Sequence, residues 1–284
     1  MRDGQASVTA MGIALMRAHE TGRPAAERVL EDPFARHFAP APMRWLFAGV
    51  RHLSRAGVNL MIARERFGDE VLQRELARGL EQVVLLGAGY DARAYRFKDA
   101  LEGVGVFEVD HPATQARKQR ELVSLMGALP PHVTFVPIDF KRQTLAERLA
   151  SSGFHSGAKT LFIWQGVTPY LDDAAVDHTL AYITRHAAPG STLVFDYVIR
   201  RFMKGPLQRR EFRLLSVFRP LSGERLQWGL EVDEVVPFLE RRGFTDIENL
   251  THEALHARYF QGAAARREVY DVVGLVAARV AAPS

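Results

Sequence analysis

A short apolar run that turns through two glycines is the feature that most constrains the fold of this chain. Residues 82–97 read QVVLLGAGYDARAYRF, so an apolar segment leads into a glycine turn at 87–89, and Asp91 then opens a segment with helical spacing. A buried strand that turns sharply into a helix through glycines brings backbone N–H groups close to a ligand. Ala92 replaces the third glycine of the G-x-G-x-x-G pattern, as the looser G/A form allows. The neighbouring segments must therefore identify the ligand.

The second apolar run ends in an acid at the spacing of a nucleotide-binding unit. Residues 104–110 read VGVFEVD, and Asp110 lies 21 residues after Gly89. The second strand of a βαβ nucleotide-binding unit offers a carboxylate to ribose hydroxyls at a similar spacing. A helix N-cap or a turn residue is the alternative role for such an aspartate.

Polar residues also follow the next two candidate strands. Residues 133–138 are followed by Asp139 and Phe140, and residues 160–164 are followed by Gln165. Open α/β sheets bind ligands at the carboxyl ends of their strands. The recurrence of polar groups at these positions therefore favours a ligand site at this edge.

The order of the candidate elements predicts one α/β domain over residues 1–284. Alternating strands and helices are typical of a mostly parallel sheet with helices on both faces, and two final strands are expected as an antiparallel edge pair. The expected parts are an N-terminal helical cover (1–80), a core of alternating strands and helices (81–198), an inserted basic lid (199–230), and a C-terminal helix with edge strands (231–284).

Composition excludes several classes of function. The chain has 284 residues, 47% of them hydrophobic, which is enough for the core of one large domain. It contains no cysteine, which excludes disulfides, thiolate catalysis and zinc–thiolate sites, and we expect no metal. No apolar run approaches the roughly 18 residues of a membrane span, and early charges interrupt any signal-peptide core, so we expect a cytoplasmic protein. A net charge of +4 is too small to indicate nucleic-acid binding.

Several segments together resemble the leucine carboxyl methyltransferase superfamily. They read VVLLGAGYDARAYRF, VFEVDHPATQARKQREL, VPIDF, FIWQGVTPYLDDAAV and GSTLVFDYV, and the earlier segment RPAAERVLEDPFARHF is also similar. The resemblance implies a class I methyltransferase fold with a Rossmann-like sheet and S-adenosylmethionine (SAM) as methyl donor. It also implies O-methylation of a carboxylate or hydroxyl. Bacterial members include polyketide O-methyltransferases, so an aromatic polyketide-like product of secondary metabolism is one expected acceptor.

The resemblance also implies roles for the residues of the glycine turn. Gly87, Ala88 and Gly89 would pack against the methionine part of SAM. Asp91 would cap the following helix, and Arg93 would pair with nearby carboxylates to hold the turn.

Three further positions match the nucleoside-binding residues of the family. Asp110 would bind the ribose, and Asp139 with Phe140 would hold the adenine. Glu108 would be either a second polar contact or a buried partner for Arg93.

Two residues match positions that bind the amino-acid end of SAM. Arg64 would clamp the carboxylate through a planar two-bond fork, with Arg66 as the competing candidate. Gln165 stands where many relatives carry Glu, and its carbonyl oxygen can still accept from the ammonium, without charge. The backbone carbonyl of Gly87 is the alternative acceptor.

Candidates for catalysis are few. A carboxylate acceptor is ionised at neutral pH and needs no general base, whereas a phenol or alcohol benefits from one. Tyr197, His111 and Tyr170 follow or end candidate strands and are the polar groups expected near the mouth of the site.

The basic lid is the sequence feature that points to the substrate. Cations near the mouth of a site concentrate anionic acceptors. We expect Arg200, Arg201, Arg213 and Trp228 to contribute to substrate binding, with a solvated helix face or plain packing as the alternative.

Three other functions remain open at this point. A protein C-terminal carboxyl methyltransferase would use the same donor, and a protein that binds SAM without catalysis would share the donor site. An NAD(P)-binding oxidoreductase would share the glycine turn and the acid, although the chain shows no evident Tyr-x-x-x-Lys pair.

Overall fold

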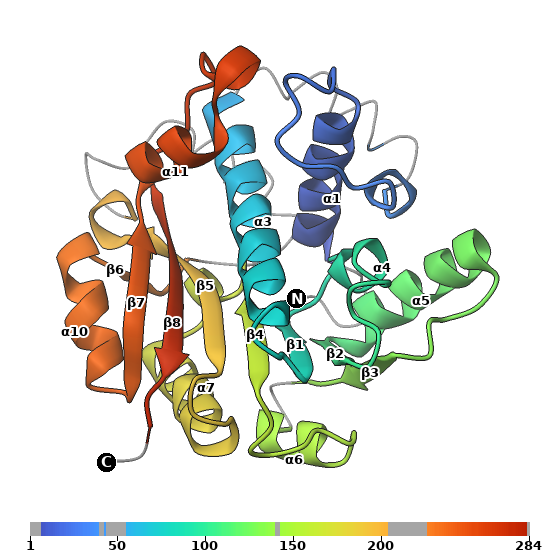
Figure 1. The fold of residues 1–284 in the computed structure, drawn as a ribbon, viewed down its shortest axis with the longest axis vertical. Coiled ribbons are helices and arrows are strands. Elements are labelled where there is room, and N and C mark those ends of the chain that lie inside the picture. The colour runs from blue at the N-terminus through green and yellow to red at the C-terminus, as the bar shows by residue number, and fades with distance from the viewer. Residues whose placement is uncertain (1–6, 40–42, 44–54, 140–142, 204–225, 283–284) are drawn as a thin grey trace.

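Within the described residues, eight strands form one sheet at the centre of the molecule (Figure 1). The structure is a computed structural model that describes residues 7–39, 43, 55–139, 143–203 and 226–282. The strand order is β3-β2-β1-β4-β5-β8-β7, and β6 pairs with β5 outside this path. The strands are β1 (Gln82–Leu86), β2 (Gly105–Asp110), β3 (Val133–Pro137), β4 (Thr160–Trp164), β5 (Thr192–Ile199), β6 (Gly229–Leu230), β7 (Phe244–Leu250) and β8 (Val273–Val280).

The five strands β1 to β5 run parallel, which confirms the expected core of the sheet. Val84 of β1 lies opposite Phe107 of β2 and Phe162 of β4. Every residue of β1 and β4 is buried, as is typical of parallel strands with both faces covered. Because β2 and β4 flank β1 on opposite sides, the carboxyl ends of β1 and β4 form the switch point where such sheets bind ligands.

The antiparallel pair at the other end of the sheet is also confirmed, with a difference in detail. β8 runs antiparallel to both β5 and β7 and lies between them, so only β7 is at the edge. β8 pairs with β5 over Val273–Arg279 and with β7 over Leu275–Val280. The two-residue strand β6 was not predicted, because so short a segment has no periodicity. Most of the expected lid, residues 204–225, lies outside the described residues.

Several of the described helices begin at a residue whose side chain caps them. Ser7 Oγ accepts the N–H of Ala10 at 3.1 Å, and Asp172 Oδ1 accepts the N–H of Ala175 at 2.8 Å. The α-helices are α1 (Val8–Thr21), α3 (Arg55–Leu76), α4 (Arg93–Arg96), α5 (Pro112–Met126), α6 (Leu145–Ala150), α7 (Asp173–His186), α10 (Val235–Glu240) and α11 (His252–Tyr259). Short 3₁₀ helices are η1 (Ala35–His37), η3 (Thr168–Tyr170), η4 (Arg200–Phe202), η5 (Val232–Glu234) and η6 (Gly262–Ala264).

The helix α3 lies across one face of the sheet and connects it to the N-terminal helix (Figure 1). It contacts β4, β5 and β8, and α1 packs beside it. Its buried side includes apolar Ile62 and Phe67, but also charged Arg64, Glu65 and Asp69. Buried charges are costly unless they are paired, so this face of α3 requires ionic partners from its neighbours.

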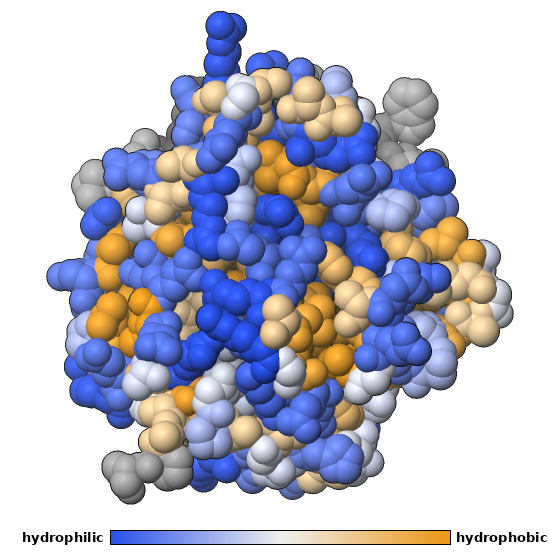
Figure 2. Space-filling view, in the orientation of Figure 1, coloured by the Kyte–Doolittle hydropathy of each residue, from blue (hydrophilic) through white to orange (hydrophobic). Residues whose placement is uncertain are grey.

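Hydrophilic residues cover much of the visible surface, and apolar residues are exposed in small patches between them (Figure 2). Val123, Leu125 and Met126 at the end of α5, together with Val236, are the large apolar side chains with the greatest exposure in the described part of the chain. Among the described helices, none combines the length and hydropathy needed to cross a membrane.

The close packing of Tyr197 against Gly274 gives a prediction about stability. These residues face each other across β5 and β8, and a Cβ on Gly274 would lie 2.3 Å from Tyr197 Cζ. We therefore expect Gly274→Ala to lower the free energy of unfolding by about 1–3 kcal/mol, measured by urea denaturation. Gly12→Ala is the control, since a Cβ at Gly12 meets nothing within 4 Å. Equal stability of the two variants would contradict the prediction.

Candidate functional site

The glycine turn after β1 is folded tightly against its neighbours. Gly87 and Gly89 have positive φ angles of 70° and 49°, which favour glycine. The N–H groups of Gly87 and Ala88 donate to Val109 O at 2.8 and 3.0 Å. A Cβ on Gly87 would lie 2.4 Å from Val167 Cγ2, so the turn also packs on the segment after β4. The turn therefore lies at the switch point between β1 and β4.

Asp110 lies beside this turn at the end of β2. One carboxylate oxygen accepts the N–H of Gly89, and the other accepts the N–H of His111 at 2.5 Å. Burial raises the pKa of Asp110, while the two N–H groups act in the opposite direction. A carboxylate offers about four lone-pair positions, so two remain for other donors. The expected proximity of Gly89 and Asp110 is present in the structure.

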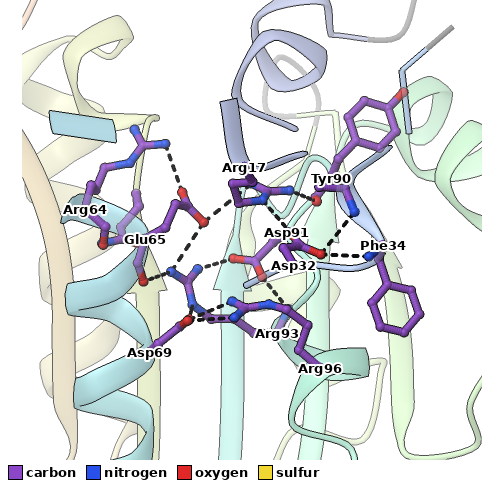
Figure 3. Close-up of polar contacts among 12 residues, drawn as sticks. Arg17, Asp32, Phe34, Arg64, Glu65, Asp69, Tyr90, Asp91, Arg93 and Arg96 are labelled. Carbon is purple, nitrogen blue, oxygen red and sulfur yellow. Dashed lines mark hydrogen bonds and ion pairs between the residues drawn. The ribbon is translucent and has the colours of Figure 1, made fainter. Parts of the chain in front are cut away.

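Arg93 is the centre of a buried ion network that holds the turn (Figure 3). Its guanidinium pairs with Asp91 and with Asp69 Oδ1 at 2.8 Å, and it donates to the backbone carbonyl of Glu65 at 2.8 Å. Arg93 is only 1% exposed. Burial opposes its charge, but Asp91, Glu65 and Asp69 outweigh this effect and raise its pKa. The structure thus gives Arg93 the carboxylate partners expected for it.

Asp91 contacts the start of the following helix, as expected, whereas Glu108 does not take up the expected contact with Arg93. Asp91 Oδ1 accepts the N–H of Arg93 at 2.7 Å, at the first turn of α4, in addition to its ion pair. Glu108 does not pair with Arg93: its carboxylate lies 2.7 Å from Lys118 Nζ and accepts from Tyr95 Oη at 2.6 Å. Glu108 of β2 therefore forms a separate buried cluster with Lys118 and Tyr95.

Arg17 connects the N-terminal helix to the same network. It pairs with Asp32 at 2.8 Å and with Glu65 at 3.4 Å, and it donates to the carbonyl of Tyr90, the residue after the glycine turn. Neither Arg17 nor these two acids was singled out from the sequence. Charged residues at buried positions of an otherwise amphipathic helix, as Glu65 is in α3, are the signal that could have identified them.

Arg64 of α3 lies at the opposite end of the network. Its NH1 lies 3.2 Å from Asp196 Oδ2, and its NH2 lies 3.2 Å from Glu65 Oε1. Burial opposes the charge of Arg64, but Asp196 and Glu65 outweigh this effect and raise its pKa. The third nitrogen, Nε, is buried and has no hydrogen-bond partner among the described residues.

Gln165, which follows β4, contacts Arg64 directly. Its Nε2 donates to Arg64 O at 3.0 Å, while its Oε1 is buried and accepts no hydrogen bond from the described part of the chain. The two residues thus present one unpaired donor and one unpaired acceptor. Arg66, the competing arginine, is not part of this arrangement.

Of the two adenine-binding candidates, the structure describes Asp139. It lies two residues after the end of β3, and its N–H donates to Gln143 Oε1 at 3.1 Å. Phe140 lies outside the described residues.

The three catalytic candidates have structural partners. His111 caps α5, because its Nδ1 accepts the N–H of Ala113 at 3.2 Å. Tyr170 belongs to η3, and its carbonyl accepts from Gln227 Nε2 at 2.8 Å. The prediction that Tyr197 lies near the mouth of the site is wrong. Tyr197 is fully buried, and its hydroxyl donates to Asn249 Oδ1 at 3.1 Å.

The orientation of Tyr197 follows from its position on β5. Neighbouring residues of a strand point to opposite faces, and Asp196 is directed toward Arg64 on α3. Tyr197 therefore points away from the switch point. Burial also raises its pKa to about 12, so it is poorly suited to act as a base near neutral pH.

The structure describes three of the four expected substrate-binding residues, and each has partners within the protein. Arg200 pairs with Glu234 at 2.7 Å, and Arg201 pairs with Glu231 at 3.2 Å, on the surface. Trp228 is buried, with its ring 6.4 Å from Phe195 and 5.8 Å from Phe238. Its role in the described structure is core packing. Arg213 lies outside the described residues.

Solved structures with the same architecture define the class of the fold. A crystal structure described as a "putative methyltransferase" from Thermobifida fusca YX has a TM-score of 0.56 at 14% identity and covers 99% of this chain and 97% of that chain. The CurJ carbon methyltransferase has a TM-score of 0.53 at 16% identity, with coverage of 96% and 67%. The fold is that of the class I SAM-dependent methyltransferases.

Sequence comparisons identify the family. The model of the leucine carboxyl methyltransferase family matches residues 10–184. A Bacillus subtilis protein named "Putative S-adenosyl-L-methionine-dependent methyltransferase YktD" is 32% identical over 201 residues, which cover 70% of this chain and 65% of that protein, just under two thirds of its length. A Streptomyces coelicolor protein of the same designation is 33% identical over 273 residues, with coverage of 85% and 87%. The chain belongs to the leucine carboxyl methyltransferase family and is a SAM-dependent methyltransferase.

The ion pair of Asp91 with Arg93 predicts a pH dependence of stability. Burial opposes the charge of Asp91, but Arg93 outweighs it and lowers the pKa of this carboxyl from 3.8 to about 2. Because the folded-state pKa is lowered, the ion pair stabilises the protein fully above about pH 4 and this stabilisation is lost as the pH falls through about 2.

We expect Asp91→Asn to lower the free energy of unfolding by about 2 kcal/mol near neutral pH, and this difference to shrink toward about pH 2. Urea unfolding of both proteins over this pH range measures the difference. A difference that stays constant with pH would contradict the assigned ion pair.

Proposed function

We propose that this chain transfers the methyl group of SAM to a carboxylate oxygen of a small molecule, with a hydroxyl as the second candidate acceptor. One observation carries the donor half of this proposal. Arg64 Nε and Gln165 Oε1 are buried without hydrogen-bond partners in the described structure, on two residues that contact each other. The amino-acid end of SAM has a carboxylate and an ammonium, which require one donor and one acceptor.

The other residues around the switch point fit the remainder of the donor. The backbone of Gly87 and Gly89 allows a close approach, and Asp110 retains lone pairs for ribose hydroxyls. Asp139 at the end of β3 is the candidate for the adenine amine. Bound SAM supplies a methyl group activated by a sulfonium, and these residues would hold that group in a fixed direction for in-line attack.

The carboxylate acceptor is favoured by the positions of the candidate bases. His111 and Tyr170 take part in helix capping and loop contacts, and Tyr197 points away from the switch point. An ionised carboxylate needs no proton removed, so its methylation does not require any of the described residues to act as a general base. Arg200 and Arg201 pair with surface glutamates in the described structure, so the argument for a carboxylate acceptor rests on the candidate bases and not on these arginines.

Asp110→Ala tests the proposed ribose contact. The variant should bind S-adenosylhomocysteine (SAH) more weakly by about 1–3 kcal/mol, because buried donors lose their acceptor. Calorimetric titration measures this, with Asp177→Ala as the control, since Asp177 pairs with Arg242 on the surface. Unchanged affinity of Asp110→Ala would refute the ribose role, and binding of NADH in place of SAH by the wild type would refute the donor site.

The acceptor atom can be tested by the stability of the product. We expect methyl transfer from labelled SAM to a panel of aromatic and aliphatic carboxylic acids, giving methyl esters that release methanol in alkali. Phenols and alcohols of matched shape would instead give ethers, which are stable in alkali. Alkali-stable products alone would contradict the carboxylate assignment, and labelled protein C-termini would identify a protein acceptor.

A further inference from the structure

Asp196 is a buried carboxylate on β5 that was not anticipated from the sequence. It is 3% exposed. Its Oδ1 accepts the N–H of Gly166 at 2.6 Å, and its Oδ2 lies 3.2 Å from Arg64 NH1. Its backbone carbonyl accepts from the hydroxyl of Thr168. One residue thus connects the arginine of α3 to the segment that follows β4.

The two carboxylates bound to Arg64 differ in their other partners. Glu65 also lies 3.4 Å from Arg17 NH1 and 3.5 Å from Arg93 NH2, as Figure 3 shows in part. Arg64 is the only cation within ion-pair distance of Asp196 among the described residues. A buried carboxylate that loses its only cation is strongly destabilised. Glu65 can therefore release Arg64 at lower cost than Asp196 can.

The turn at Gly166 is shaped around the same guanidinium. Gly166 has a φ angle of 73°, and a Cβ there would lie 2.9 Å from Arg64 NH1. Asp196 bonds both the turn and the guanidinium, so it sets the position of one relative to the other. In this orientation, NH1 and NH2 are used within the protein and Nε remains for a ligand.

We propose that Asp196 is a positioning residue that holds Arg64 with its Nε available to the carboxylate of the methyl donor. When this carboxylate binds, Glu65 gives up its contact with Arg64 NH2, and Asp196 keeps its own. This inference rests on the donor site proposed above. The negative charge of Asp196 acts on Arg64, so loss of that charge should weaken binding of ligands that carry the carboxylate and spare those that lack it. A residue needed only for folding would affect both kinds of ligand.

Asp196→Asn is the variant that tests this role. The asparagine keeps an oxygen for the N–H of Gly166, but it removes the charge that holds Arg64. SAH carries the donor's carboxylate, whereas 5′-methylthioadenosine has the same nucleoside and sulfur without the amino-acid group. By calorimetry, we expect the variant to bind SAH about tenfold more weakly than the wild type and to bind methylthioadenosine with nearly unchanged affinity.

Two matched variants separate this role from a general effect of removing a buried carboxylate. Asp69→Asn removes an equally buried charge that pairs with Arg93 and Arg96, so it should leave the ratio of SAH to methylthioadenosine affinity unchanged. Glu65→Gln removes the other partner of Arg64, and the ratio should stay constant or rise. Equal losses of both ligands in Asp196→Asn, or an equal fall of the ratio in Glu65→Gln, would overturn the inference.

Gly166→Ala examines the same contact without removing any charge. Its Cβ would displace the guanidinium of Arg64, so SAH affinity should fall while methylthioadenosine affinity is retained. If Asp196→Asn does not fold, Gly166→Ala tests whether the position of Arg64 controls SAH binding. Unchanged SAH affinity of Gly166→Ala would overturn the inference. If wild-type protein binds methylthioadenosine but not SAH, the proposed donor site itself fails, and the inference fails with it.

Discussion

The buried guanidinium of Arg93 is the interaction on which the rest of the site depends. It joins α3, through Glu65 and Asp69, to the glycine turn, through Asp91. Breaking such a pair by removing one partner costs on the order of 3–5 kcal/mol, because the remaining charge stays buried. Arg17 extends the network to α1, so ion pairs and hydrogen bonds connect the N-terminal helix, α3 and the segment that contains the glycine turn. The proposed donor site therefore lies within the part of the fold that ion pairs connect.

The parallel core of the sheet could be predicted because its signals are local. The apolar runs of β1 and β4 are short and buried throughout. Glycine or a polar residue follows each run and marks the carboxyl end of the strand. The contact between Gly89 and Asp110 could be predicted for a related reason. Neighbouring parallel strands place their carboxyl ends side by side, so the spacing along the chain implies proximity in space.

The residues that were misplaced depend on contacts between distant segments. Whether Tyr197 faces the site depends on Asn249 and Gly274, which belong to strands far along the chain. The partners of Arg200 and Arg201 likewise lie about thirty residues later, in η5 and just before it. Glu65 and Asp196 were missed because a buried acid on a helix or strand has no local pattern. Only the assembled fold shows the arginine between them.

The position of β8 between β5 and β7 affects the order in which the strands can pair during synthesis. β7 joins the sheet only by pairing with β8, but β8 follows β7 in the chain and is synthesised later. When β7 leaves the ribosome, its partner strand does not yet exist, and much of the edge of β5 is also unpaired. Exposed strand edges are the surfaces through which nascent chains associate wrongly. Pairing of β8 thus closes the free edges of β5 and β7 together.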